Sequence, residues 1–303
     1  MRVAVTGAGG RLGTSIRKEL ANKPFVEAVL AWDIPAHDLD DPRSADRLVE
    51  RDHPDLVIHT AAWTDVDGCA REPERAMRRN GEATGELARA CVEHGASLVA
   101  VSTNEVFDGR RTDGQPYRAG DTPNPINPYG ASKLAGERAA TDAFAADADA
   151  GAGAGGSQLA IVRTAWLFGP GAPDFPTKIL ANARRAAAAG EPLLAVADEW
   201  GNPTYAADVA AGIVDLVEGG RFGGIHHVVN GLFATRSQWA LYVVGRAGLS
   251  VEVRDVPATT WQRASTPPRW GVLEPTPLPS GPLRPWPEAM AEYAPALLAR
   301  SER

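Results

Sequence analysis

Residues 2–20 read RVAVTGAGGRLGTSIRKEL, an apolar run, a glycine-rich turn and a helical pattern in immediate succession. This order is typical of a strand–turn–helix unit that binds a dinucleotide. Gly7 permits a tight turn, Gly10 lets the backbone approach a pyrophosphate, and Gly13 lets the helix sit close to the strand. A plain strand-to-helix turn is the alternative, but the place of the motif after the first strand favours cofactor binding.

The start of the helix predicts where the diphosphate of the cofactor binds. Helix N-termini carry free N–H groups that attract an anion, and Arg11 and Leu12 lie there. The spacing is GxxGxxG, with Gly9 as an additional glycine. The predicted cofactor-binding residues of this segment are therefore Gly7, Gly10, Arg11, Leu12 and Gly13.

An acidic residue after the second predicted strand bears on the choice of cofactor. Asp33 follows the expected strand 26–31, about twenty residues past the glycines, where a carboxylate usually holds a ribose 2′-hydroxyl. Such a carboxylate repels a 2′-phosphate, so the sequence favours NADH over NADPH. NADPH stays open, because Arg11 in the glycine turn could meet a 2′-phosphate.

Composition and charge exclude several classes of protein. The chain has 303 residues and a net charge of −7 with no long basic run, so nucleic acid is not an expected partner. No apolar stretch approaches eighteen residues, and the first residues form a strand rather than a signal peptide, which predicts a cytoplasmic protein. Cys69 and Cys91 are the only cysteines, and no spacing predicts a metal site. A monomer and a homodimer both remain open.

Apolar runs alternate with helical patterns over the first half of the chain, which predicts an α/β fold with a Rossmann-like, doubly wound parallel sheet. The expected strands are 3–6, 26–31, 56–60, 98–102 and 159–163, and the expected helices are 11–21, 42–51, 74–94 and 128–145. Residues 147–157 are rich in Ala, Gly and Asp and predict a flexible surface loop. A proline-rich region then precedes a closing helix near 287–300.

This pattern predicts two domains. The dinucleotide-binding domain would span residues 1–163, joined by about 205–230. The smaller, C-terminal substrate-binding domain would comprise residues 164–204 and 231–303.

Polar residues follow two of the expected strands, where ligands bind in an open parallel sheet. Strand 98–102 runs into Thr103, Asn104 and Glu105, and a hydroxyl there can donate to a carbonyl oxygen that gains charge. Strand 56–60 runs into Ala61 and Ala62, whose small side chains would let the cofactor lie against the backbone.

Tyr129 and Lys133 stand four residues apart, so a helix places them on one face about one turn apart. A phenol with a pKa near 10 is a weak catalyst at neutral pH, and a neighbouring ammonium is expected to pull that pKa down. The pair is a weak signal alone, but it gains weight beside a cofactor motif and Thr103.

Six stretches together resemble the extended short-chain dehydrogenase/reductase superfamily, and within it the dTDP-4-dehydrorhamnose reductase family. They are the glycine loop, HTAAWTDVD, STNEVFDG, NPINPYGASKLAGE, VRTAWLFG and GNPTYAADVA. The resemblance runs in order over most of residues 1–230 and is weaker over the last seventy.

The resemblance implies NAD(P)H-dependent reduction of the C4 ketone of a nucleotide-activated, dTDP-type 4-keto-6-deoxysugar. It implies that Tyr129 supplies the proton, that Lys133 binds the nicotinamide ribose, and that Thr103 hydrogen-bonds the C4 oxygen. It also implies an asparagine near the active site, Asn80, and a set of sugar contacts that comprises Thr64, Val66, Asn104, Glu105 and Trp166.

Departures from the family pattern refine this expectation. The family usually has Asp-Tyr where this chain has Asn104-Glu105, so Glu105 should change which sugar hydroxyls are accepted. Related 4,6-dehydratases have Asp-Glu there, and Asn104 cannot replace the acid, which favours a reductase. Ser15 stands where some relatives hold a metal, so no metal is expected.

Two alternatives remain open. One is another epimerase or dehydratase of sugar nucleotides from the same superfamily. The other is a non-catalytic regulatory subunit that resembles the one of methionine adenosyltransferase.

Overall fold

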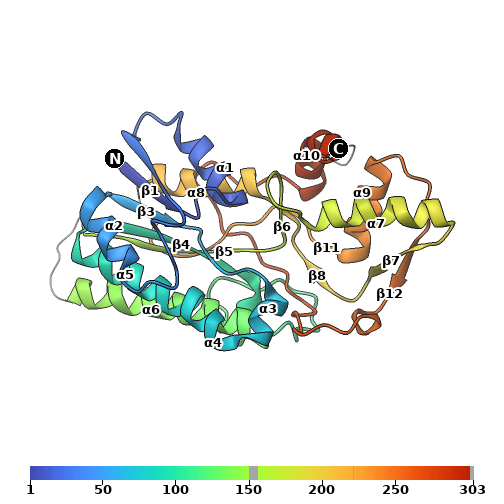
Figure 1. Cartoon of the computed structure of the whole chain (residues 1–303), viewed down its shortest axis with the longest axis horizontal. Helices are drawn as coiled ribbons and strands as arrows, with labels where there is room; N and C mark the ends of the chain where they lie inside the picture. Colours follow the sequence, from blue (N-terminus) through green and yellow to red (C-terminus); the bar gives the residue numbers. More distant parts are fainter. Residues whose placement is uncertain (150–155, 221, 301–303) are drawn as a thin grey trace.

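A parallel sheet of six strands forms the centre of the computed structural model, which describes residues 1–149, 156–220 and 222–300 (Figure 1). The strand order is β10-β5-β4-β3-β1-β2, and every neighbouring pair is parallel. The strands are β1 Arg2–Thr6, β2 Ala28–Trp32, β3 Leu56–His59, β4 Ser97–Thr103, β5 Leu159–Thr164 and β10 Gly224–His227. The predicted doubly wound α/β fold is confirmed.

Helices cover both faces of this sheet (Figure 1). One face packs against α1 and α8, where Ile16, Val209 and Ile213 are buried with the side chains of the strands. The other face packs against α2, α5 and α6 through Leu48, Leu87 and other buried apolar side chains. These helices are α1 Arg11–Leu20, α8 Ala206–Glu218, α2 Ser44–Asp52, α5 Ala83–Glu93 and α6 Pro128–Asp149.

A second group of elements lies beyond one end of the sheet (Figure 1). Its core contains Trp239, Met290 and Tyr293 from the helices α9 and α10, together with side chains of α7. The helices are α7 Phe175–Ala189, α9 Arg236–Arg246 and α10 Trp286–Arg300. Three two-stranded pairings join short strands here: β6 Leu167–Phe168 with β9 Thr204–Tyr205, β8 Trp200–Gly201 with β11 Ala234–Thr235, and β7 Leu193–Val196 with β12 Val253–Val256.

Several boundaries differ from the sequence prediction. The expected helix 74–94 is divided into α4 Pro73–Ala76, the π-helical η1 Met77–Glu82 and α5, and it is preceded by α3 Val66–Arg71. Strand β2 begins at Ala28, because Val26 closes a turn by donating from its amide to the Lys23 carbonyl. The expected loop 147–157 is helical up to Asp149, and its residues 150–155 lie outside the described ranges. Two 3₁₀ turns, η2 Asn104–Val106 and η3 Ala258–Thr260, complete the elements named here.

Within the described residues, no helix combines the length and the apolar character that crossing a lipid bilayer requires.

Candidate active site

One cavity of about 670 Å³ opens at the carboxyl ends of the sheet strands, where open α/β sheets bind their ligands. All residues that the sequence predicts to bind cofactor, to catalyse or to contact sugar lie on its wall. They are Gly7, Gly10, Arg11, Leu12, Gly13, Asp33, Ala61, Ala62, Thr64, Val66, Thr103, Asn104, Glu105, Tyr129, Lys133 and Trp166.

The glycine turn forms one end of this cavity. Gly7 has a φ of +59°, and a Cβ atom at Gly13 would lie 2.2 Å from the Gly7 carbonyl oxygen. These two positions therefore require glycine, because a side chain would force the first strand and α1 apart. Gly10 precedes α1 and provides no side chain to cap it, so the first N–H groups of the helix remain free to hold an anion.

Asp33 lies directly beside the glycine turn. Its Oδ2 accepts a hydrogen bond of 2.7 Å from the Gly9 amide, and its Oδ1 accepts one of 3.0 Å from the Ile34 amide. The carboxylate is thus fixed at the place where the sequence predicts a ribose hydroxyl.

Arg11 points away from Asp33. Its Nε donates to the Gly169 carbonyl at 3.1 Å, and its guanidinium also donates to the Ala172 carbonyl. Asp174 lies 4.0 Å away on the same loop. The guanidinium is therefore held against residues 169–174 rather than at the ribose.

Ala61 and Ala62 follow β3 and lie against the glycine turn. The Ala61 amide donates to the Thr6 hydroxyl at 3.1 Å, and a Cβ at Gly7 would lie only 3.0 Å from the Ala61 Cα. This contact leaves the backbone of both segments facing the cavity.

Thr103, Tyr129 and Lys133 line the same cavity. Thr103 is the last residue of β4, and Tyr129 and Lys133 lie one turn apart on α6. The Tyr129 phenol and the Thr103 side chain share a hydrogen bond. Gly130 makes this approach possible, because a Cβ there would lie 2.0 Å from the Glu105 carbonyl oxygen.

The pKa of Tyr129 departs from the sequence prediction. Burial raises it above the ordinary value, the Glu105 charge adds to this, and the hydrogen bond with Thr103 acts in the opposite direction. Lys133 is not among the groups that shift it, so the predicted lowering by the ammonium is wrong for this structure. Burial also lowers the pKa of Lys133 to about 8, against an opposing effect of Glu137. At neutral pH the site therefore holds a protonated phenol beside an ammonium.

The sugar contacts implied by the resemblance also line the cavity. The Asn104 amide donates to the Gly271 carbonyl at 2.9 Å, which attaches η2 to the C-terminal segment. The Glu105 Oε2 accepts a hydrogen bond of 2.7 Å from the Asn127 amide. Burial raises the pKa of Glu105, and Asn127 counteracts this.

Trp166 has a left-handed backbone, with a φ of +41°, and the Arg236 guanidinium carbon lies 3.6 Å from the centre of its ring. Arg236 lines the same cavity, although it was not among the site residues predicted from the sequence. It lies seventy residues after Trp166 at the start of α9, outside any recognised motif. Burial lowers its pKa to about 10, so its charge persists at neutral pH.

Asn80 is buried behind the cavity instead of lining it. Its Oδ1 accepts from the Trp63 amide at 2.8 Å, and its Nδ2 donates to the Trp63 carbonyl and to the Ser132 hydroxyl. Asn80 therefore fixes the segment after β3 to α6, and is not a surface residue of its helix.

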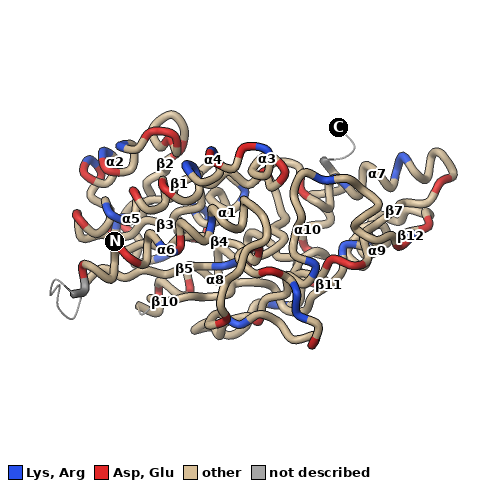
Figure 2. Tube along the Cα trace, turned by 90° about the horizontal axis from the view of Figure 1, so that it is seen from below, with Lys and Arg blue, Asp and Glu red and all other residues tan. Residues whose placement is uncertain are grey.

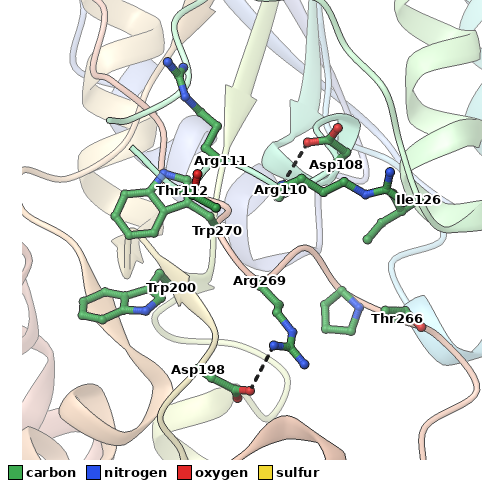
Figure 3. A pocket seen from close by; sticks show the side chains of 12 residues that line it. Asp108, Arg110, Arg111, Thr112, Ile126, Asp198, Trp200, Thr266, Arg269 and Trp270 are labelled. Atoms are coloured by element: carbon green, nitrogen blue, oxygen red, sulfur yellow. Dashed lines mark hydrogen bonds and ion pairs between the residues drawn. The ribbon is translucent and has the colours of Figure 1, made fainter. Parts of the chain in front are cut away.

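A second cavity of about 590 Å³ contains none of the predicted site residues (Figure 3). Trp200 and Trp270 lie on its wall with ring centres 5.8 Å apart. Arg269 lies 3.8 Å from Asp198, and Asp108 accepts from the Arg110 backbone amide (Figure 3). It presents no pair of groups suited to acid–base chemistry.

A dinucleotide turn at one end of a cavity, with a threonine, a tyrosine and a lysine at the carboxyl ends of the same parallel sheet, is the arrangement of the extended short-chain dehydrogenases/reductases. Within this class the chain belongs to the family described as RmlD substrate binding domain, whose model matches residues 1–298.

Named proteins of this kind are similar over nearly the whole chain. The dTDP-4-dehydrorhamnose reductase of Streptomyces griseus is 34% identical over 310 residues, covering 100% of this chain and 96% of the relative. A solved dTDP-4-dehydrorhamnose reductase from Clostridium acetobutylicum has a TM-score of 0.88 at 28% identity, covering 98% of this chain and 99% of the other. The enzyme from Bacillus anthracis, solved in complex with NADP, has a TM-score of 0.84 at 29% identity, covering 96% and 98%.

Proposed function

We propose that this protein is an NAD(P)H-dependent reductase of the C4 ketone of a dTDP-activated 4-keto-6-deoxysugar, in deoxysugar or rhamnose biosynthesis. The observation that carries this proposal is the meeting of Thr103, Tyr129 and Lys133 in the cavity that begins at the glycine turn. The names of the similar reductases support the substrate class.

The residues at the glycine turn fit a dinucleotide. The close approach of Gly13 to Gly7 brings α1 against the first strand, and no side chain caps the N-terminus of α1, which leaves its N–H groups to a diphosphate. Asp33 would hold the ribose hydroxyls at one end, and Lys133 would hold the nicotinamide ribose at the other. When bound, the nicotinamide cofactor supplies the hydride.

The side chains of the protein provide the rest of the reaction. The Thr103 and Tyr129 hydroxyls donate hydrogen bonds to the ketone oxygen, which gains negative charge as C4 accepts the hydride. The Tyr129 proton passes from its Oη to this oxygen, giving an alcohol and a phenolate. The Lys133 ammonium stabilises the phenolate until a proton returns from solvent.

Asn104 favours reduction over dehydration. Elimination of water needs a proton donor at this position, and the Asn104 amide is engaged with the Gly271 carbonyl.

For the cofactor, we propose a preference for NADH. Asp33 lies where a 2′-phosphate would be repelled, and Arg11 is held by the carbonyls of Gly169 and Ala172. The similar enzyme from Bacillus anthracis was solved with NADP, so both cofactors must be compared. A kcat/KM higher with NADPH than with NADH would contradict the preference.

The reductase is tested by the decay of NADH fluorescence on addition of dTDP-4-keto-6-deoxyglucose or its C3/C5 epimer, followed by NMR of the C4 configuration. Consumption of one equivalent of NADH per sugar is expected. Binding of cofactor and sugar without turnover would support the regulatory-subunit alternative instead.

We further propose that the enzyme acts in the cytoplasm on this small-molecule substrate, as a monomer or homodimer, without nucleic acid. Acidic and basic residues alternate along the described part of the chain (Figure 2). The net charge of −7 supports the same conclusion. Light scattering during gel filtration distinguishes the two oligomeric states.

A further inference from the structure

Arg236 occupies a fixed position in the cavity wall beside Trp166. Its guanidinium lies over the Trp166 ring at 3.6 Å, and its Nε lies 3.7 Å from a Glu199 carboxylate oxygen. Stacking and the carboxylate together restrict the plane of the guanidinium. The side chain is 23% exposed and lines the cavity, so N–H groups remain available to a ligand.

One oxygen of the Glu105 carboxylate is held by Asn127. Asn127 donates to its Oε2 at 2.7 Å, and the Asn127 Oδ1 accepts from the Gly130 amide at 2.8 Å. In the described part of the chain, no hydrogen bond reaches the second carboxylate oxygen, Oε1. An acceptor in the cavity wall thus remains available.

Glu105 and Arg236 influence one another without forming an ion pair. Both side chains line the same cavity, and no ion pair joins them among the described residues. The charge of each also shifts the pKa of the other. A group that both donates and accepts hydrogen bonds can satisfy the carboxylate and the guanidinium at once. A sugar hydroxyl is such a group, whereas a phosphate would be repelled by Glu105.

The position of Glu105 selects which hydroxyl this is. The Glu105 amide donates to the Thr103 hydroxyl at 3.2 Å, and both residues line the cavity with Tyr129, so Glu105 lies beside the site of the ketone oxygen. In a 4-keto-6-deoxyhexose the ketone carbon has two neighbours. C5 carries the ring oxygen and a methyl group, and C3 carries a hydroxyl.

We propose that Glu105 and Arg236 bind the C3 hydroxyl, so that the enzyme selects 4-keto-6-deoxysugars that retain it and rejects their 3-deoxy counterparts. This inference rests on the proposed reductase function. A 3-deoxy sugar would leave the second Glu105 carboxylate oxygen and an N–H group of Arg236 without a hydrogen bond. A site built to bind a hydroxyl rejects such an analogue by about 10⁴-fold.

The test compares dTDP-4-keto-6-deoxyglucose with its 3-deoxy analogue. Wild-type kcat/KM should be about 10³–10⁴-fold lower for the analogue. In Glu105→Gln and Arg236→Gln, the parent sugar should lose about 10²-fold while the analogue changes little, so discrimination falls. Arg236→Lys keeps the charge but not the planar fork, so its discrimination between the two sugars should lie between those of the wild type and Arg236→Gln.

Arg263→Gln is the matched control. Arg263 lies 3.7 Å from the same Glu199 but does not line the cavity, so this variant should keep the wild-type discrimination. Thermal melting and NADH binding show that each variant is folded.

Three results overturn the inference while leaving the reductase intact: equal turnover of both sugars by the wild type, an equal loss of both sugars in the variants, or weaker binding of dTDP alone to Arg236→Gln. The last result would make Arg236 a diphosphate ligand. If the wild type reduces neither sugar, the proposed function itself fails, and the inference with it.

Discussion

Burial keeps the proton on the Tyr129 phenol at neutral pH. Its pKa lies above the ordinary value of a phenol, mainly because the ring is removed from water. The phenol therefore keeps its proton at neutral pH and is ready to donate it to an alkoxide. The reverse oxidation of the alcohol needs a phenolate, and the same environment makes that state costly.

Tyr129→Phe should lower kcat by about 10²–10⁴-fold, because a general acid of this kind contributes that much. The affinity for NADH, measured by fluorescence titration, should stay within a few fold of the wild type. Tyr117→Phe is the control, since the Tyr117 hydroxyl donates to Asp108 outside the active-site cavity. Wild-type turnover by Tyr129→Phe would refute the mechanism.

Activity should fall above about pH 8. The Lys133 pKa is lowered to about 8, so the ammonium that holds the ribose and stabilises the phenolate is lost as the pH rises through that value. A profile of kcat/KM between pH 6 and pH 10 measures this. Lys133→Arg should remove the alkaline limb even if its rate is lower, and an unchanged limb would assign the titration to another group.

The sequence predicted the identity of the groups at the site better than their environment. Thr103, Tyr129 and Lys133 belong to motifs with fixed spacing, and the cavity brings them together. The direction of the Tyr129 pKa shift was wrong because burial depends on packing that spacing does not encode. Arg236 was missed because it reaches the site only through the tertiary contact of α9 with Trp166.

At the scale of elements, α6 depends on close contacts that only glycine allows. A Cβ at Gly136 would lie 2.5 Å from the Asn80 carbonyl oxygen in η1. Together with the contact of Gly130 against η2, this brings α6 near enough for Tyr129 to reach Thr103. The helix that carries the catalytic pair is thus positioned by backbone approach.

Gly136→Ala should destabilise the protein by about 1–3 kcal/mol, because the added methyl group forces α6 away from η1. Gly245→Ala is the matched control on α9, where nothing lies within 4 Å of the added Cβ, and it should be neutral or stabilise by up to about 1 kcal/mol. Urea unfolding measures both, and equal effects would contradict the assigned contact.

Elements with a clear apolar pattern were predicted, and the exceptions have physical reasons. Strands β1, β3, β4 and β5 are buried apolar runs and were expected within one or two residues. Strand β10 was missed because it lies at the edge of the sheet with Gly224 and Ile225 exposed, and so lacks an apolar run.

At the scale of the whole molecule, we propose two domains: residues 1–163 joined by about 205–230, and residues 164–204 with 231–303. The packing of α8 on α1 and the pairing of β10 with β5 support the return of the chain to the first domain. Arg11 joins the two parts through its hydrogen bonds to residues 169–172.

Hydrogen exchange tests this division. Met290→Ala removes a fully buried side chain from the core of α7, α9 and α10, and should lower protection there with little change in β1–β5. Ile213→Ala, in the core beneath the sheet, should do the reverse. A uniform loss of protection in both variants would show a single cooperative unit.

Strand β10 covers the edge of β5 but is synthesised well after it, so the cell can complete the sheet only late in translation. Until His227 has left the ribosome, β5 is an unprotected edge strand, and until α8 has been made, Ile16 lacks part of its cover. A nascent chain therefore carries a full cofactor motif long before it has a finished sheet. A chain that is truncated before β10 should therefore aggregate and depend on chaperones. It should not fold as an independent dinucleotide-binding domain.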